Sequence, residues 1–314
     1  MSDIRLSIVI PHFNSPVKLD ELLGSIGQHD DVEVIVTDDN STKYLDEYEA
    51  CVAKYSGRGV KFFKNDSGQK NAGAARNVGL SKATGEWLIF SDADDYFVDG
   101  WYDAVSANFD KTEYDVIFYK VSDIDSKHDQ EGVKKAVLRY NLLCDAVLAG
   151  LEHAEDMIRI YHYAPWSKMI RHSLLKANDI HFESIRYSND LLFSTKVGVC
   201  AGKITVCDKP YYFHTTTQGS LSTNRSEEAF CTKQTAYCHR CDYLHNNMDR
   251  KRLKAVNNNE GLRRLGIAAK RHYGVRNLFK YYKMYRKNHV PVFTLKPDEI
   301  TRLKRMLRKA GKNV

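Results

Sequence analysis

The first hundred residues alternate short apolar runs with stretches of helical periodicity, and this alternation restricts the fold more than any other feature. Apolar runs at residues 7–10, 32–36, 60–63 and 87–90 are typical of buried strands. Between the first two runs, Pro16 suits the first turn of a helix, and the apolar residues that follow repeat at helical spacing. A helix of small residues is expected over residues 72–82. The pattern predicts an α/β fold with a mostly parallel central sheet.

Polar clusters follow three of the expected strands, at the point where each strand ends. Asn14 and Ser15 follow the first strand, Asp38 and Asp39 end the second, and the run 91–95, Ser-Asp-Ala-Asp-Asp, follows the strand at 87–90. Ligands bind at the carboxyl ends of the strands in open α/β sheets. Five carboxylates at one edge repel one another unless a cation or hydrogen-bond donors offset them. Mg²⁺ or Mn²⁺ would suit such oxygens and would also neutralise a diphosphate, whereas any single aspartate could equally be a turn or helix-capping residue.

The familiar phosphate-binding loops are missing from the sequence. No Gly-x-Gly-x-x-Gly follows the first strand, and no Gly-Lys-Ser/Thr occurs, which disfavours dinucleotide dehydrogenases and P-loop enzymes. A sugar nucleotidyltransferase on a similar fold would need a basic loop after the first strand, and residues 11–15, Pro-His-Phe-Asn-Ser, do not provide one. A bound nucleotide would have to be held by carboxylates, a metal ion and isolated basic groups.

Five segments in order resemble the family 2 glycosyltransferases, which have the GT-A fold. They are the opening strand and turn at 7–14, the second strand end at 36–42, Ala75-Arg76-Asn77, the D-x-D segment at 92–94, and an acceptor-side stretch that includes Trp166-Ser167-Lys168 and Asn189-Asp190. A closing loop from 211 to 222 follows them. The resemblance covers roughly residues 4 to 225. It implies a GT-A catalytic domain over residues 1–225, with a donor-binding half at about 1–110 and an acceptor half at about 111–225.

The resemblance also implies roles for individual residues. Asp39 would hydrogen-bond the nucleotide base, Arg76 would lie near the diphosphate, and Asp190 would be the general base that deprotonates the acceptor hydroxyl, with inversion at the anomeric carbon. The residues expected to contact the donor are Pro11, Phe13, Asp39, Arg76, Asp92 and Ala93. Mn²⁺ or Mg²⁺ would be bound by Asp94 and Asp92. His214 is either a third metal ligand or an ordinary loop histidine, and Asn189 replaces the glutamate that usually precedes the base.

The charge is distributed unevenly along the chain. From Arg250 to the end there are 20 Lys or Arg residues and three acids, a net charge of +17, while the preceding residues carry −10. This helical, basic region, residues 226–314, suggests an anionic partner. An aromatic stripe at Leu278, Tyr281, Tyr282 and Tyr285 lies between lysines and favours an anionic membrane surface, although the stripe could instead pack on the catalytic domain. No motif supports a nucleic acid partner.

Other features concern the compartment and the cysteines. No apolar run approaches the length that spans a bilayer, so we expect a cytoplasmic protein with peripheral contact to the inner face of the membrane. The seven cysteines are odd in number and irregularly spaced, which fits free thiols. The run 238–241, Cys-His-Arg-Cys, contains only one C-x-x-C, so packed thiols are favoured over a zinc site.

The function expected from these features is transfer of a hexose or N-acetylhexosamine by an inverting, metal-dependent glycosyltransferase. The donor would be a nucleotide sugar with uracil as its base, a UDP-sugar. The acceptor would be a hydroxyl of a saccharide or lipid-linked saccharide in surface polysaccharide synthesis. The alternatives are the sugar nucleotidyltransferase and a membrane- or RNA-binding protein with a degenerate transferase domain. Asp39, Arg76, Asp94 and Asp190 are all present, which speaks against degeneracy.

Overall fold

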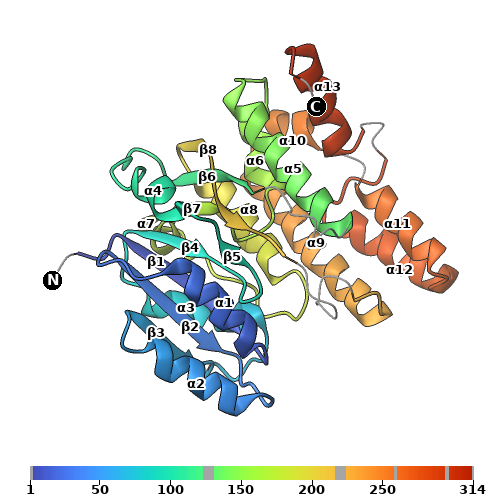
Figure 1. The fold of residues 1–314 in the computed structure, drawn as a ribbon. Coiled ribbons are helices and arrows are strands. Elements are labelled where there is room, and N and C mark those ends of the chain that lie inside the picture. Colours follow the sequence, from blue (N-terminus) through green and yellow to red (C-terminus); the bar gives the residue numbers. More distant parts are fainter. Residues whose placement is uncertain (1–2, 123–130, 216–223, 258–259, 294–296, 313–314) are drawn as a thin grey trace.

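A single mixed sheet of eight strands, in the order β3-β2-β1-β4-β7-β6-β8-β5, forms the centre of the structure (Figure 1). This computed structural model describes residues 3–122, 131–215, 224–257, 260–293 and 297–312. The strands are β1 (Leu6–His12), β2 (Val32–Asp38), β3 (Val60–Lys64), β4 (Trp87–Phe90), β5 (Tyr96–Phe97), β6 (Val116–Val121), β7 (Lys168–Arg171) and β8 (Ile204–Phe213). Neighbours are parallel in four pairs, β1 with β2, β1 with β4, β2 with β3, and β6 with β8. The predicted α/β class with a mostly parallel sheet is confirmed.

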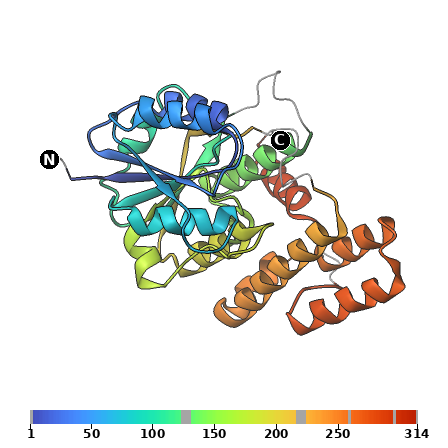
Figure 2. The same ribbon diagram turned by 90° about the horizontal axis from the view of Figure 1, so that it is seen from below.

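Helices cover both faces of the sheet. Figure 2 shows α1 and α2 on one face and α3 and α8 on the other. The helices are α1 (Pro16–Ile26), α2 (Leu45–Tyr55), α3 (Ala72–Lys82), α4 (Trp101–Ser106), α5 (Glu131–Leu148), α6 (Ala154–Tyr161), α7 (His172–Ala177), α8 (Asn189–Cys200), α9 (Glu227–Asn247), α10 (Arg250–Val256), α11 (Glu260–Lys270), α12 (Gly274–Lys287) and α13 (Glu299–Lys309). β1, β2 and β4 are almost wholly buried, which explains why their sequences are continuous apolar runs rather than alternating ones.

Helix α3 lies directly against β1. The Asn71 side chain caps the helix by accepting a hydrogen bond from the Ala74 amide at 2.9 Å. A Cβ on Gly79 would lie 2.6 Å from a methyl group of Val9, so a glycine is required for this close approach. The small residues predicted for 72–82 therefore bring α3, and with it Arg76, close to the ends of the parallel strands.

Helix α8, which begins one residue before Asp190, is fixed at its other end by a buried arginine. The guanidinium of Arg159 donates to the carbonyl oxygens of Gly198 at 2.9 Å, Ala201 at 2.5 Å and Gly202 at 3.0 Å. The last carbonyls of a helix have no intrahelical donor, so these bonds satisfy them and set a cation against the negative end of the helix dipole. The contact joins α8 rigidly to α6.

The C-terminal helices have a second buried apolar cluster, formed by α9, α11 and α12 together with Leu191 of α8. In Figures 1 and 2 these three helices project away from the sheet, whereas α13 returns to pack on α5. Tyr281 and Tyr285 are buried in this cluster, so the expectation that the aromatic stripe faces a membrane is wrong for these two residues. Cys238 and Cys241 also lie in it as packed thiols, as favoured above.

Within the described part of the chain, no helix is both long enough and apolar enough to cross a bilayer.

The close contact between α8 and α6 predicts the effect of a one-carbon substitution. A Cβ on Gly198 would lie 2.0 Å from the carbonyl oxygen of Arg159, so Gly198→Ala should force α8 away from α6 and destabilise the protein by about 1–3 kcal/mol. Gly266→Ala in α11 is the matched control, because nothing lies within 4 Å of its Cβ and alanine favours the helix by up to about 1 kcal/mol. Urea denaturation of both variants measures the difference. Equal stabilities would contradict the packing described here.

Candidate active site

The loops after β1 and β2 are bonded to each other where the two parallel strands end. Asn14 and Asn40 both have positive φ, +52° and +58°, which asparagine tolerates better than most residues. The Asn14 side-chain oxygen accepts hydrogen bonds from the backbone amides of Thr42 at 2.8 Å and Lys43 at 3.0 Å. The backbone amide of Asn14 donates to the Ser41 hydroxyl at 2.8 Å. These bonds hold the strand ends side by side at the edge where the other polar clusters converge.

His12 and Asp38 support this edge from beneath. His12 is buried, and its Nδ1 lies 2.9 Å from an Asp38 oxygen while its Nε2 accepts from the Ser15 amide at 3.2 Å. The ring also stacks on Tyr48 at 4.8 Å between centroids. Burial raises the pKa of Asp38, but hydrogen bonds from His12 and Ser41 outweigh it, so the pKa is lowered. His12 is therefore a buried support of the loops that follow β1 and β2.

Asp39 lies beside the amino end of α3. Its carboxylate accepts from the Asn65 side chain at 2.6 Å, and Asn65 in turn donates to the Gln69 carbonyl at 2.7 Å. Burial raises the pKa of Asp39, with Asn65 and the charge of Lys70 working in the opposite direction. The Lys70 ammonium lies 4.5 Å from the centre of the Phe13 ring, which is 45% exposed. An exposed ring, a cation and a held carboxylate thus line this part of the edge, next to the half-buried Pro11.

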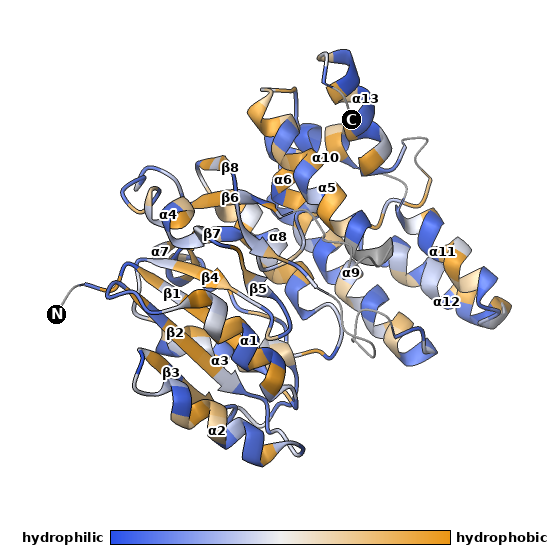
Figure 3. Ribbon diagram, viewed as in Figure 1, coloured by the Kyte–Doolittle hydropathy of each residue, from blue (hydrophilic) through white to orange (hydrophobic). Residues whose placement is uncertain are grey.

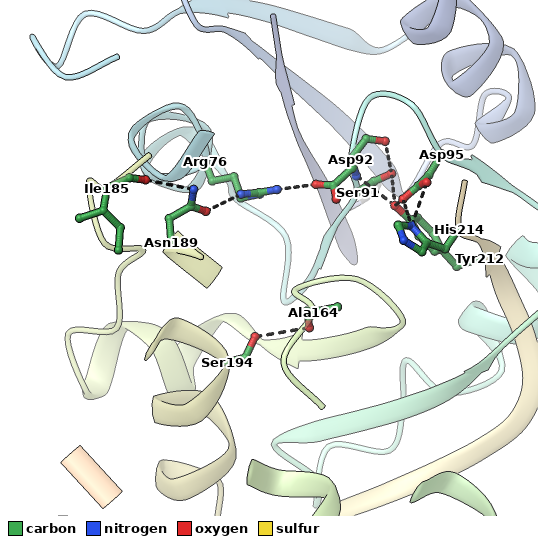
Figure 4. A network of polar contacts seen from close by, with 10 residues as sticks. All are labelled: Arg76, Ser91, Asp92, Asp95, Ala164, Ile185, Asn189, Ser194, Tyr212 and His214. Atoms are coloured by element: carbon green, nitrogen blue, oxygen red, sulfur yellow. Dashed lines mark hydrogen bonds and ion pairs between the residues drawn. The ribbon is translucent and has the colours of Figure 1, made fainter. Parts of the chain in front are cut away.

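The D-x-D segment follows β4 and is held from below by Tyr212 of β8 (Figure 4). The Tyr212 hydroxyl donates to the Asp95 carboxylate at 2.5 Å and accepts from the Asp92 amide at 3.0 Å. Asp95 also accepts from the Thr215 amide at 2.6 Å. Ala93 is buried, while the carboxylates of Asp92 and Asp94 lie on the more exposed side of the turn. Asp95, rather than either aspartate of the D-x-D, is therefore the anchor of this turn.

His214 lies against the same anchor. Its Nδ1 is 3.1 Å and 3.2 Å from the two Asp95 oxygens, and its ring stacks on Trp166 at 4.5 Å between centroids. Burial lowers the pKa of His214, but the Asp95 carboxylate more than compensates, so the pKa is raised on balance. Metal-binding histidines commonly donate their second ring nitrogen to a carboxylate in this way. The geometry fits either of the two roles left open for His214.

Arg76 joins the two halves of the site. One terminal nitrogen of its guanidinium forms an ion pair with Asp92, and the other donates to the Asn189 side-chain oxygen at 2.9 Å (Figure 4). The side chain is 7% exposed and lies over the Phe182 ring, 5.3 Å from its centre. Its Nε is buried and has no hydrogen-bond partner among the described residues. Arg76 thus connects the end of β4 to the first residue of α8.

Asp190 follows Asn189 in the first turn of α8 and is half-buried. Burial raises the pKa of Asp190, the Arg76 cation lowers it, and the Asp92 charge raises it again. The net shift is upward, which makes Asp190 a stronger base than an ordinary aspartate. Asn189 cannot supply charge, but its amide bridges Arg76 and the Ile185 carbonyl, at 3.2 Å from the latter. The asparagine therefore takes a holding role in this chain.

Sequence reasoning gave no role to Lys168, which is fully buried at the start of β7. Its ammonium donates to the His162 carbonyl at 2.9 Å and lies 5.4 Å from the centre of the Phe118 ring. Burial lowers the pKa of Lys168 to about 7, and the charge of Asp190 opposes the shift. The sequence offered one signal, the place of Lys168 in the acceptor-side stretch that also includes Asn189 and Asp190, but it did not indicate that the lysine would be buried.

Protein donors offset much of the negative charge at this edge. Asp38, Asp39, Asp92 and Asp95 are held by His12, Asn65, Arg76 and Tyr212, respectively. No group of three or more His, Cys, Asp or Glu side chains within the described ranges converges closely enough to hold a metal ion alone. The structure brings Arg76, Asp92, Asn189 and Asp190 together, while Asp39 lies at the other end of the edge.

Comparison with known proteins identifies the class to which this fold and site belong. The sequence matches the description of glycosyl transferase family 2 over residues 7–178. The chain belongs to this family, and the predicted membership is confirmed. The enzyme class expected from the sequence, a glycosyltransferase, agrees with it.

Particular relatives extend the comparison. The chain is 31% identical over 224 residues to the poly(ribitol-phosphate) beta-N-acetylglucosaminyltransferase TarS of Staphylococcus aureus, a match that covers 69% of this chain and 36% of that protein. It is 30% identical over 223 residues to a poly(ribitol-phosphate) beta-glucosyltransferase of Bacillus spizizenii, covering 67% and 32%. The chain thus spans about a third of the length of these curated relatives.

Solved structures share the fold. The crystal structure of S. aureus TarS 1–349 in complex with UDP-GlcNAc has a TM-score of 0.65 and 23% identity, covering 95% of this chain and 83% of that one. The mannosyltransferase PcManGT of Pyrobaculum calidifontis, in complex with GDP-Man and Mn²⁺, has a TM-score of 0.56 and 14% identity, covering 98% and 81%. These similarities confirm the predicted GT-A fold.

The buried ammonium of Lys168 makes the stability of the protein depend on pH in a defined direction. The pKa of Lys168 is about 7 in the folded chain and about 10.4 in an unfolded one, so the unfolded chain binds more protons between these values and stability rises with pH across that window. Lys168→Met should therefore gain stability relative to the native chain, by at least ~1 kcal/mol more at pH 6 than at pH 9.

Urea denaturation at the two pH values measures this difference. Lys111→Met is the control, because Lys111 is exposed and its replacement should change stability equally at both values. The hydrogen bond to the His162 carbonyl is lost at every pH and cancels in the comparison. If the gain from Lys168→Met is the same at pH 6 and pH 9, Lys168 does not titrate as described.

Proposed function

We propose that this chain transfers a sugar from a UDP-sugar to a hydroxyl group of a saccharide, polymer or lipid-linked acceptor, with inversion at the anomeric carbon. The observation that carries the proposal is the position of Arg76, which is bonded both to Asp92 of the D-x-D turn and to Asn189 beside Asp190. A donor-binding carboxylate and a candidate base are thereby held on either side of one cation.

The donor would bind along the edge formed by the ends of β1, β2 and β4. Asp39 would accept a hydrogen bond from the nucleotide base, the exposed Phe13 ring and Pro11 would cover it, and Arg76 would lie near the diphosphate. Ala93, buried in the turn, would let the sugar nucleotide approach the backbone. The choice of UDP is supported by the relative TarS, which has been crystallised with UDP-GlcNAc. The transferred sugar would be a hexose or an N-acetylhexosamine.

Asp190 would accept the proton of the acceptor hydroxyl at a carboxylate oxygen as that hydroxyl attacks the anomeric carbon. Its raised pKa favours proton transfer, and the charge of Arg76 limits the rise. The attack comes from the face opposite the leaving diphosphate, so the configuration at the anomeric carbon inverts.

The residues present fit a divalent cation, Mn²⁺ or Mg²⁺, shared with the donor. Such ions are commonly bound by one or two carboxylates plus substrate phosphates, so the pair Asp92 and Asp94 suffices and no cluster of three protein ligands is needed. The Asp95 carboxylate is already bonded to His214, which leaves the second ring nitrogen of His214 for a ligand. When bound, the cation would offset the charge of the departing diphosphate.

The acceptor and setting follow from the relatives and the charge of the chain. Two relatives are named as acting on poly(ribitol-phosphate), and another, from Campylobacter jejuni, on an undecaprenol-linked saccharide. We infer that residues 1–225 form the catalytic domain and that the basic residues 226–314 bring it to an anionic membrane surface. The enzyme would then act in the cytoplasm, peripherally on the inner face of the membrane, in surface polysaccharide synthesis.

Thermal-shift screening of nucleotide sugars with Mn²⁺ tests the donor. With Mn²⁺ present, a UDP-sugar should raise the melting temperature more than the GDP-sugar with the same sugar does, and more than UDP does without Mn²⁺. Ligands that bind only the folded state stabilise it. Stabilisation by GDP-sugars alone would contradict the choice of uracil, and no effect of any nucleotide sugar would contradict the proposal as a whole.

The metal assignment predicts the effect of Asp94→Asn. Loss of one charged oxygen ligand should weaken UDP binding in the presence of Mn²⁺ by at least ~10-fold while the fold stays intact. Asp99→Asn, an exposed aspartate five residues further along the chain, should leave binding unchanged. Calorimetric titration with UDP, with and without Mn²⁺, separates the two variants. A native Mn²⁺ dependence in Asp94→Asn would show that Asp94 is not a ligand.

The base assignment predicts the effect of Asp190→Asn. The amide keeps the size of the side chain but cannot accept the proton, so transfer should fall by at least ~10²-fold with donor affinity nearly unchanged. The native enzyme should lose activity as the pH falls through the pKa of Asp190, which lies above that of an ordinary aspartate. Asp208→Asn, on the exposed part of β8, is the control. Loss of donor binding with transfer retained would assign Asp190 a structural role.

A further inference from the structure

Helix α12 presents an apolar ridge to solvent on a face different from its buried one. Tyr281 and Tyr285 point into the second core, but Val275 and Phe279 are 82% and 57% exposed. These two residues are four apart, so their side chains are neighbours on one face of the helix. Phe293, 75% exposed, follows α12 and extends the ridge through its ring contact with Tyr282, 6.4 Å between centroids.

Such a ridge is unusual because its members are contiguous. Single exposed apolar residues are common on protein surfaces, whereas grouped ones mark sites of interaction. Figure 3 shows that α12 carries both strongly hydrophilic and hydrophobic residues, and that it lies at the end of the projecting helices, away from the sheet. The ridge is therefore accessible and remote from the candidate active site.

A row of cations flanks the ridge. Helix α12 contains five basic residues and no carboxylate, and at helical spacing all five lie on or beside the exposed side of the helix: Arg276, Lys280, Lys283, Arg286 and Lys287. The Lys283 ammonium lies 4.5 Å from the centre of the Phe279 ring, so charge and apolar surface are in direct contact. Helix α9 places one carboxylate beside α12: Glu227 accepts a hydrogen bond from the Asn277 side chain at 2.8 Å.

We propose that the ridge of Val275, Phe279 and Phe293, with its flanking cations, binds an anionic lipid bilayer, α12 lying in the interfacial plane. This inference rests on the proposed function only because that function would take place at a membrane. The membrane contact is assigned to the exposed side of α12 and not to the buried stripe of Tyr281 and Tyr285. Apolar side chains enter the boundary between headgroups and acyl chains, while lysines and arginines reach anionic headgroups.

Other occupants fit the surface less well. A second copy of the chain related by a two-fold axis would bring the same row of cations against itself, which is repulsive. A nucleic acid would use the charge, but it would leave Val275 without a favourable contact. The bilayer is the occupant that uses the apolar ridge and the cations together.

Co-sedimentation of the full chain with phosphatidylcholine vesicles, with and without about 30 mol% phosphatidylglycerol, tests the proposal. The native chain should bind the anionic vesicles and lose binding as salt rises, because exposed charges are screened. The double substitutions Val275→Ser with Phe279→Ser, and Lys280→Gln with Lys283→Gln, should each weaken the partition coefficient at least ~10-fold. Melting curves establish that each variant is folded.

Matched controls remove comparable groups elsewhere. Val17→Ser with Leu138→Ser removes two apolar side chains, 64% and 40% exposed, from α1 and α5. Arg305→Gln with Lys309→Gln removes two charges from α13, where they line a cavity of about 310 Å³. Both controls should bind vesicles within about twofold of the native chain, because neither alters the surface assigned to the bilayer. UDP-sugar hydrolysis, measured on every variant, should stay unchanged, so failure of membrane binding and failure of the proposed function are separate results.

Several results would overturn the proposal. The proposal is wrong if the α12 variants bind anionic vesicles as tightly as the native chain does, or if the α13 variant alone loses that binding. It is also wrong if the native chain binds neutral and anionic vesicles equally, or binds neither. Concentration-dependent self-association that Val275→Ser with Phe279→Ser abolishes would assign the ridge to a second copy of the chain. Displacement from anionic vesicles by single-stranded RNA, with tighter RNA binding in low salt, would assign it to nucleic acid.

Discussion

The contact on which the rest of the site depends is the guanidinium of Arg76, held between Asp92 and Asn189. A buried cation is costly unless it is paired, so the ion pair with Asp92 makes its burial possible. The planar, forked shape of the group allows it to reach two partners at once, one in the turn after β4 and one at the start of α8. The position of Arg76 depends in turn on α3 lying against β1, which the absence of a side chain on Gly79 permits.

The carboxylates around this cation show how one sheet edge can carry five acids. Most of them already have protein donors, and these donors divide them into two groups. Asp38 and Asp95 are supports, bonded to His12 and Tyr212 beneath the loops. Asp39 and Asp92 are instead bonded to side chains that lie beside α3 or on it, Asn65 and Arg76 respectively. Electrostatic repulsion among these carboxylates is thus reduced by donors that the protein itself supplies.

Much of the fold could be predicted from the sequence because it is encoded locally. The helix at 72–82 and the strand at 87–90 have the predicted bounds, since small residues and a buried apolar run leave few alternatives. The roles of Lys168 and Tyr212 could not be predicted, because each depends on the pairing of strands distant in sequence. The aromatic stripe was misread for a related reason. Periodicity shows that Tyr281 and Tyr285 share a face with each other, but not that α9 covers it.

The measurement that tests the central role of Arg76 most directly is a double-mutant cycle on UDP-sugar hydrolysis with Arg76→Lys and Asn189→Ala. Lysine keeps the charge but cannot hold Asp92 and Asn189 together, and alanine removes the partner on α8. If Arg76 acts by joining the two halves, each single variant should slow the reaction and the double variant should be little slower than the worse single one, because both break the same connection. Strictly additive losses would contradict the account, since the two residues would then act independently.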